Sequence, residues 1–559
     1  MTTPLQGDAP AAVAPAGRPA PAQRAGGGLA GVGDLARMAV RRDRIMLPIW
    51  VYVSAALTAE IAYGLKKLYP TGASRDSLAL TVGRNPALSF LYGQLRGSSL
   101  GALTDWRFLT YAALYAGLMS TFLVIRHTRA DEEAGRLELV GSAAVGRRAP
   151  LTAALVVAVA ANVGVMVLVA VVLIALGLPA AGAVVFGLAA GACGLVFTAL
   201  AAVAAQVSGT ARGARGLAFA VLGAVYLLRG IGDSAGAAGP AWLSWLSPIG
   251  WSELIRPFAG PRWWVLALPA CAAAGLAGLA FWLAAHRDQG QGLIADRPGR
   301  PRAGMCLRGP LGLAWRLQLG TLAAWTFGLF VYGAAVGSTA KGIGSLLGSN
   351  PGLKHAIERI GGQPALTSAY LAGVMSLAGL LAAAYAVSAV LRLYAEERAQ
   401  RADPVLVTPT GRVRWAAGQL AVTVAGSAVA LAAAGLGAGL LYGARTGELG
   451  TQIPRLLGAA LVQLPAVLAV AGVAVLVFGL RPSWSAGGGW TAMGLAAAIT
   501  LFGPAVQAGQ WLLDVSPFSH LPRLPGAAVS AVPLAWLTAA AVALAAVGLA
   551  ALRHRDISG

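Results

Sequence analysis

The stretch HTRADEEAGRLELVGSAAVGRR, residues 127–148, holds eight acidic or basic side chains, although only 11% of the chain is charged and 57% is hydrophobic. A second charged stretch, LYAEERAQRADPVLVTPTGRVR, residues 393–414, follows the same pattern 265 positions later. The residues that align at this offset are Glu132 with Glu397, Arg136 with Arg401, Glu138 with Asp403, Gly146 with Gly411 and Arg147 with Arg412. A charged segment that occurs twice in a hydrophobic chain predicts a duplicated unit.

The rest of the chain is apolar enough for a membrane. Its mean hydropathy is +0.70, and its apolar runs reach the roughly 20 residues that a helix needs to cross a bilayer. Because these runs are continuous rather than alternating, they predict an all-α polytopic membrane protein and not a barrel. The twelve expected spans are 45–65, 108–125, 150–178, 180–206, 216–230, 263–285, 315–337, 366–390, 416–443, 455–479, 487–507 and 530–552.

The positive charge fits membrane topology better than nucleic-acid binding. The net charge is +21, and more than half of the 42 lysine and arginine residues lie in the segments on one side of the predicted spans. By the positive-inside rule this side is cytoplasmic, with both termini on it. The expected parts are a disordered cytoplasmic tail (1–36), a first six-helix half (37–285), a cytoplasmic linker (286–314), a second six-helix half (315–552) and a C-terminal tail (553–559).

A second match between the halves occurs late in each of them. LSPIGW, residues 246–251, aligns with VSPFSH, residues 515–520, at an offset of 269. Two matches in the same order predict two repeats of six helices, and an even number of crossings makes these repeats parallel. The shared Ser-Pro before the sixth span is compatible with a short re-entrant or surface-lying element, while the tryptophans around Trp245 fit an interfacial aromatic belt.

Catalytic chemistry is not indicated. The five histidines fall in separate loops or tails, and no nucleophile and base are spaced as a pair. The cysteines do not form a metal-binding spacing either. A proton-coupled transporter needs carboxylates at membrane depth to carry the proton. Glu60 is the one candidate, and its expected position is near the water interface. The chain contains no Gly-Lys dipeptide, so it lacks the phosphate-binding loop of an ATPase. Any ATP drive must come from a separate subunit.

The charged segments are interpreted as short amphipathic helices at the inner membrane surface. Glu132 and Arg136 are spaced i,i+4 in the favourable order for a helix, and Glu397 repeats this spacing with Arg401. The alternative is that each segment is a solvated loop whose arginines only fix the membrane topology. Such a loop would not require acidic residues at the same positions in both segments. In the second copy Pro404 and Pro409 replace Leu139 and Ala144, so we expect its helix to be shorter.

These segments resemble the coupling region of ABC-2-type exporter membrane subunits. The pattern Glu-x-x-x-Arg-x-[Glu/Asp], ending in Gly-Arg after the second span, is similar to the family segment that docks into the nucleotide-binding subunit. The sequence TRADEEAGRLELVGSAAVGRR resembles most closely the same segment of the long actinobacterial permeases with two six-helix halves. These permeases are described as exporters of polyketide antibiotics or as multidrug-resistance permeases. The resemblance is strong at 126–150 and looser at 392–415.

The resemblance implies a role for each copy. Glu132, Arg136, Glu138, Gly146 and Arg147 would form the first ATPase-coupling site, and Glu397, Arg401, Asp403, Gly411 and Arg412 the second. One chain would then work with two copies of a separate ATPase that binds ATP and Mg²⁺, in contact with membrane lipids of the plasma membrane. The second and fifth spans of each half would line a cavity for a lipophilic substrate, with Tyr115, Met119, Phe122, Phe219, Tyr226, Met375, Tyr385 and Phe502 as candidates, although ordinary helix packing explains each of them too.

Two other classes of protein remain open. An ion-driven secondary transporter of the 6+6 type is equally duplicated, but residues 126–150 lack the Gly-x-x-x-Asp-Arg-x-Gly-Arg-Arg loop of the major facilitators. A membrane scaffold or sensor is the other alternative. Neither the identity of the substrate nor the direction of transport follows from the residues.

Overall fold

The structure is a computed structural model, and it describes residues 28–83, 86–141, 145–234, 240–288, 290–294, 304, 309–348, 362–502 and 509–555. Every regular element among these residues is a helix. The chain divides into two compact units, Met1–Arg297 and Pro298–Gly559, and this division lies inside the predicted linker 286–314.

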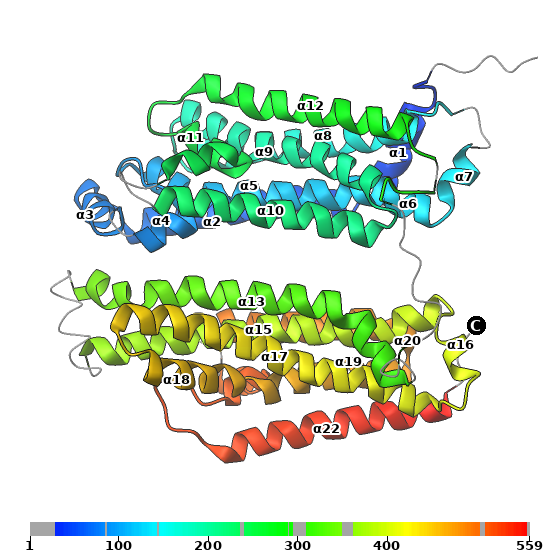
Figure 1. The fold of residues 1–559 in the computed structure, drawn as a ribbon. Coiled ribbons are helices and arrows are strands. Elements are labelled where there is room, and N and C mark those ends of the chain that lie inside the picture. Colours follow the sequence, from blue (N-terminus) through cyan, green and yellow to red (C-terminus); the bar gives the residue numbers. More distant parts are fainter. Residues whose placement is uncertain are drawn as a thin grey trace, which may run out of the picture. The chain divides into compact units, whose positions relative to one another are not determined.

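The first unit is a bundle whose long helices lie side by side (Figure 1). Helices α5 and α9 form its centre, since they are the most buried and pack on each other. The elements are α1 (Val32–Arg42), α2 (Met46–Leu68), α3 (Gly72–Val82), α4 (Pro86–Tyr92), α5 (Leu100–His127), α6 (Arg129–Glu133), α7 (Arg136–Gly141), α8 (Ala149–Ala175), α9 (Ala180–Val207), α10 (Ala211–Ser234), η1 (Ala241–Leu246), α11 (Pro248–Leu254), η2 (Trp263–Leu266) and α12 (Ala267–Ala285).

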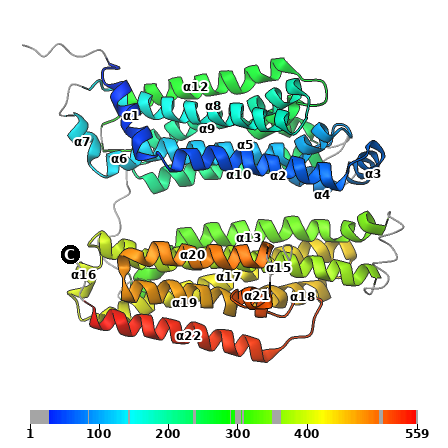
Figure 2. The ribbon, with the colours of Figure 1, turned by 180° about the vertical axis from the view of Figure 1, so that it is seen from behind.

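The second unit is also a bundle of long helices. Helix α15 is its most buried span, α13 packs on α17, and α22 packs along α19 (Figure 2). The elements are α13 (Pro310–Gly348), α15 (Gly362–Arg398), α16 (Asp403–Leu406), α17 (Arg412–Thr446), α18 (Leu449–Leu461), α19 (Leu464–Leu480), α20 (Pro482–Phe502), α21 (Gln510–Leu513), η4 (Pro517–His520) and α22 (Ala531–His554). We call the end of each unit that carries α6 and α7, or α16, its charged end.

Eleven described helices are long and apolar enough to cross a membrane. They match eleven of the twelve expected spans. The expected span 487–507 overlaps α20, a helix of 21 residues that is not among the eleven. Its first half, PSWSAGGGW, is rich in serine and glycine, which lowers its hydropathy.

Two boundaries differ from the sequence prediction. Helix α1 begins at Val32, inside the expected disordered tail 1–36; its Ala39 is buried and the helix packs on α8. The expected span 455–479 matches the candidate span Leu449–Leu480, but its helix is interrupted between α18 and α19. Pro465 has no N–H to donate to the carbonyl of Leu461, so the α-helical hydrogen-bond ladder stops there. The break leaves Gln463 between the two helices.

Helices α19 and α22 meet through glycine. A Cβ atom added to Gly548 would lie 2.6 Å from the carbonyl oxygen of Val475, and one added to Gly479 would clash with the carbonyl oxygen of Gly548. Small residues at such a contact let two backbones approach closely, which is how membrane helices gain packing energy.

We therefore expect Gly548→Val to push α22 away from α19 and to lower stability by about 1–3 kcal/mol, the usual cost of overpacking. The loss is measured as a fall in melting temperature of the purified chain. Gly494→Val is the matched control, because a Cβ at Gly494 on α20 meets nothing within 4 Å. Equal melting temperatures for the two variants would contradict this account of the contact.

Candidate functional site

The five-residue helix α6 is the junction of the charged end of the first unit. The Nε atom of the buried Arg129 donates to the carbonyl of Ser208 after α9, at 2.6 Å. The carboxylate of Glu133 accepts a hydrogen bond from the N–H of Ala211, the first residue of α10, at 2.9 Å. This contact puts a negative charge at the positive end of the α10 dipole. Helix α6 is thus joined to the ends of α9 and α10.

Glu132 joins the same helix to the segment after α12. Its two carboxylate oxygens lie 2.8 and 2.7 Å from the two terminal guanidinium nitrogens of Arg287, and it also accepts from the N–H of Gly290 at 2.6 Å. Arg287 extends the contact to α9 by donating from Nε to the side-chain oxygen of Gln206 at 2.6 Å. The side chains of Glu132 and Arg287 are 7% and 13% exposed, so this bidentate pair is largely desolvated.

The second unit contains the same pair. The guanidinium nitrogens of Arg555, the residue after α22, each lie 2.8 Å from one oxygen of Glu397. The Arg555 guanidinium lies over the ring of Phe478 on α19, 5.3 Å from its centroid. In both units an acid at the end of a buried span (α5–α6 or α15) therefore binds an arginine that follows the last span (α12 or α22), and that arginine touches α9 or α19. We call Glu132–Arg287 and Glu397–Arg555 the two clamps.

The predicted i,i+4 pairs are wrong. Arg136 binds Asp131 at 2.6 Å instead of Glu132, and Arg401 approaches Glu396 at 3.8 Å instead of Glu397. The physical reason in the first unit is Gly135, whose φ of +71° ends α6 and turns Arg136 away from the preceding turn. In the second unit Glu397 belongs to the last turn of the long helix α15.

The predicted difference in length is confirmed, since α16 has four residues whereas α6 and α7 have five and six. Pro404 lies in the first turn of α16, where proline is tolerated. The helix nevertheless ends at Leu406.

The remaining residues of the predicted coupling sites divide into exposed and anchoring ones. Arg136, Glu138, Arg401 and Asp403 are exposed. The anchoring residues are Gly146, whose N–H donates to Ala30; Arg147, which donates to the carbonyl of Ala285; Gly411, which caps α17; and Arg412, which donates to the carbonyl of Arg555.

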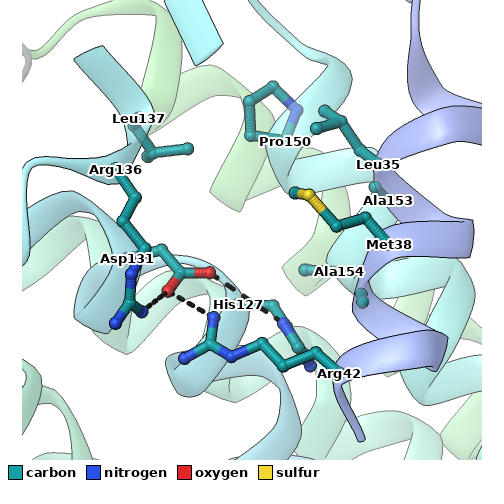
Figure 3. A pocket seen from close by; sticks show the side chains of 11 residues that line it. Leu35, Met38, Arg42, His127, Asp131, Arg136, Leu137, Pro150, Ala153 and Ala154 are labelled. Atoms are coloured by element: carbon teal, nitrogen blue, oxygen red, sulfur yellow. Dashed lines mark hydrogen bonds and ion pairs between the residues drawn. The ribbon is translucent and has the colours of Figure 1, made fainter. Parts of the chain in front are cut away.

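A pocket of about 330 Å³ opens between α1, α6, α7 and α8 (Figure 3). Its charged wall is Asp131, which binds Arg42 at 2.7 Å and Arg136 and faces His127. Behind this wall His127 binds the buried Asp43 at 2.7 Å. The opposite wall is apolar and includes Met38 and Pro150. The ion pairs tie the amphipathic helix α1 to the charged segment.

The arginines of the two clamps were not among the predicted site residues, although the sequence carries a signal for them. His286-Arg287-Asp288 follows the sixth span of the first half, and His554-Arg555-Asp556 follows that of the second. This is a third match between the halves, at an offset of 268, close to the offsets of the other two.

Four aromatic side chains form a cluster in the first unit, and three of them are predicted cavity residues. Trp50 on α2 lies 4.9 Å from the ring centroid of Tyr115 and 6.0 Å from that of Phe122. Phe219 on α10 lies 5.3 Å from Phe122. A fourth predicted residue, Tyr226, lies elsewhere on α10 and donates to the carbonyl of Leu91 at 3.3 Å.

The other cavity candidates are packed inside their units. Met119, Met375 and Tyr385 are each 0% exposed, so they contact neighbouring helices of their own unit. The side chain of Phe502 lies outside the described residues.

The end of the first unit opposite its charged end contains a buried ion pair. The sequence indicated only Glu60 as a carboxylate near membrane depth and did not predict this pair. The fully buried Arg229 binds Glu253 at 3.2 Å and Asp233 at 3.5 Å, while Thr110 donates to Glu253. Arg229 and Glu253 are 24 residues apart in the sequence. Helix α11 folds back and brings the two side chains together.

The described residues contain no group of three or more histidine, cysteine or acidic residues that could hold a metal ion.

A chain whose two units are each built from long apolar helices has the architecture of a multi-pass membrane protein. Comparison with known proteins supports this class. A family described as "Multidrug efflux system permease Rv1217c, C-terminal domain" matches residues 36–284 and 307–553. A curated relative from Mycobacterium tuberculosis, "Multidrug efflux system permease protein Rv1217c", is 45% identical over 544 residues, which cover 97% of this chain and 98% of the relative. The chain belongs to this family of multidrug efflux system permeases.

Proposed function

We propose that the chain is the membrane subunit of an ABC exporter that moves lipophilic or amphipathic drugs out of the cell. Two copies of a separately encoded ATPase, which bind ATP and Mg²⁺, would dock on the charged ends of the two units. The chain would lie in the plasma membrane with both termini cytoplasmic, and its two units would be parallel repeats of six spans.

The observation that carries this proposal is the pair of clamps. A docking site must transmit motion to the bundle, so it has to be fixed to several spans at once. Glu132 and Glu397 each connect the end of the second span to an arginine after the sixth span, and this arginine contacts the fourth. The exposed residues of the same segments, such as Glu138 and Asp403, are left to contact a partner.

Two further observations support the proposal. The family profile matches a stretch in each unit, as expected for a duplicated transporter that needs no second membrane chain. The sequence also lacks a phosphate-binding loop, so if ATP drives transport, another subunit must hydrolyse it. For the substrate, the aromatic cluster around Phe122 offers flat apolar faces of the kind that bind drug-like molecules.

The proposal is tested by co-expressing the chain with a candidate ABC ATPase subunit and weighing the purified complex by native mass spectrometry. We expect two ATPase subunits per chain, and ATP hydrolysis by the complex that rises with lipophilic compounds. The same assay on the chain alone, which should show no hydrolysis, is the control.

An ion-driven transporter would give the opposite pattern. Drug uptake into inside-out vesicles that contain the chain without any ATPase, driven by a proton gradient alone, would overturn the proposal.

A further inference from the structure

A large pocket lies in the second unit, at the end opposite to its charged end. It has a volume of about 720 Å³, within the range of about 300–1,000 Å³ that is typical of small-molecule sites. Helices α15, α18 and α20 supply its walls, together with α21 and the turn that contains η4. Ile499, Leu513 and Phe518 give it an apolar side.

A buried polar group without a partner lines this pocket. Gln463, in the break between α18 and α19, is 4% exposed, and its Oε1 atom makes no hydrogen bond to any described residue. A buried amide oxygen or N–H left unpaired costs about 1–3 kcal/mol. The amide therefore has unused hydrogen-bonding capacity at the wall of the pocket.

The pocket has a positive rim. Arg455 and Arg523 both line it. Arg455 donates to Ser368 and to the carbonyl of Pro525, both at 3.2 Å, and so holds α18 against α15 and the turn after η4. No acidic side chain lines the pocket among the residues that the structure describes. The pocket therefore combines an apolar body with cationic guanidinium groups and an amide.

The corresponding place in the first unit is filled. Ser247 donates to the carbonyl of Val225 on α10, and Ser516 donates to the carbonyl of Ala496 on α20, which places the two Ser-Pro turns at the same position in each unit. Counted from these anchors, the buried ion pair Arg229–Glu253 corresponds to Thr500 and Pro522.

Thr500 and Pro522 both line the pocket. The second unit thus has two small side chains where the first unit has a large, rigid ion pair, and this substitution leaves the space that the pocket occupies.

We propose that this pocket binds an amphipathic anion: a molecule with an apolar, drug-sized or acyl body and one acidic group that Arg455, Arg523 and Gln463 receive. Its biological role rests on the proposed export function, for which the pocket is a substrate site confined to the second unit. Binding itself requires neither ATP nor transport.

Photolabelling tests the proposal with three matched probes: 4-benzoylbenzoate, which is anionic, neutral benzophenone and the cationic 4-benzoylbenzylamine. The full chain is placed in phosphatidylcholine nanodiscs, irradiated, and the labelled residues are mapped by mass spectrometry. We expect the anion to label the pocket about tenfold more than the cation, in keeping with one charge-assisted contact. Arg455→Gln should remove most of this preference.

Gly373→Leu is the decisive variant. Gly373 lines the pocket, and a Cβ added there meets nothing within 4 Å, so leucine fills the pocket without disturbing the helix. Gly494→Leu on α20 is the control, because its Cβ is equally free and it does not line the pocket. Labelling of the pocket should fall several-fold in the first variant and stay unchanged in the second.

The arms of the experiment separate the sources of the ligand. If the anion labels the pocket less in nanodiscs that contain phosphatidylglycerol than in phosphatidylcholine nanodiscs, the lipid competes for the pocket, and the pocket takes an anionic lipid. If labelling is the same in both, the pocket takes soluble amphipathic acids. Both results support an amphipathic-anion site. Equal labelling by all three probes, or full labelling of Gly373→Leu, overturns the proposal. ATP-independent transport by a chain whose pocket is labelled would instead overturn the proposed export mechanism.

Discussion

We expect Arg555→Ala to lower the stability of the chain by about 3–5 kcal/mol, the cost of leaving one member of a buried ion pair alone. Arg555 provides both hydrogen bonds that the structure gives the Glu397 carboxylate, and Glu397 is 5% exposed. Its removal leaves a desolvated negative charge at the end of α15. The measurement is the melting temperature of the purified chain in detergent, followed by the fluorescence of its tryptophans.

Arg287→Ala should cost less than Arg555→Ala. Glu132 keeps the ion pair with Arg129 at 2.9 Å and the hydrogen bond from Gly290, so part of its charge remains compensated. This difference between the two clamps is a result that the structure predicts and the sequence alignment alone does not.

A surface pair is the control for both variants. Arg37 binds Asp34 at 2.9 Å, but these side chains are 64% and 82% exposed, and such pairs contribute about 0–1 kcal/mol. Arg37→Ala should therefore leave the melting temperature nearly unchanged. The exchange Glu397→Arg with Arg555→Glu should recover much of the stability that either change alone loses. If Arg555→Ala melts like Arg37→Ala, the clamp does not hold the unit together.

The spans could be predicted from the sequence because hydrophobicity over about 20 residues is a local property. The order and bounds of the described helices follow it closely, and the one expected span without a match, 487–507, begins in a glycine- and serine-rich stretch. The shorter second segment was predicted for the same reason, since proline acts on its own turn.

The partners of the charged side chains could not be predicted in this way. Spacing suggested that Glu132 would bind Arg136, but the left-handed residue Gly135 separates them, and the real partner Arg287 is 155 positions away. The ion pair Arg229–Glu253 likewise depends on how α11 folds back on α10. Contacts of this kind depend on tertiary packing, which a local pattern does not contain. Only the repeated His-Arg-Asp after each sixth span pointed to Arg287 and Arg555.

The clamps also change which residues can test ATPase docking. Reversing the charge of Glu132 would break a buried pair, so a loss of activity would report on folding. Glu138 and Asp403 occupy equivalent positions, are exposed, and have no side-chain partner in the structure's described residues. They are the acids that a basic or polar surface of an ATPase subunit could contact.

We therefore expect the double variant Glu138→Arg with Asp403→Arg to bind the ATPase at least about tenfold more weakly, which corresponds to about 1.4 kcal/mol. Drug-stimulated ATP hydrolysis should fall with it, because opposed charges at an interface slow association and weaken the complex. Pull-down of the ATPase and hydrolysis by the reconstituted complex measure the two effects. The melting temperature of the membrane subunit alone should stay within the range of ordinary surface substitutions, about ±0.5 kcal/mol per site.

Asp76→Arg is the control for this reversal, because Asp76 is exposed on α3, at the end of the first unit opposite to its charged end (Figure 1). It changes the net charge in the same way as one of the two substitutions and should leave ATPase binding intact. Because α16 is shorter than α6 and α7 together, Asp403→Arg alone should have a different effect from Glu138→Arg alone. Full ATPase binding by the double variant would show that the charged ends are not the docking sites, and the two clamps would then serve only the stability of their units.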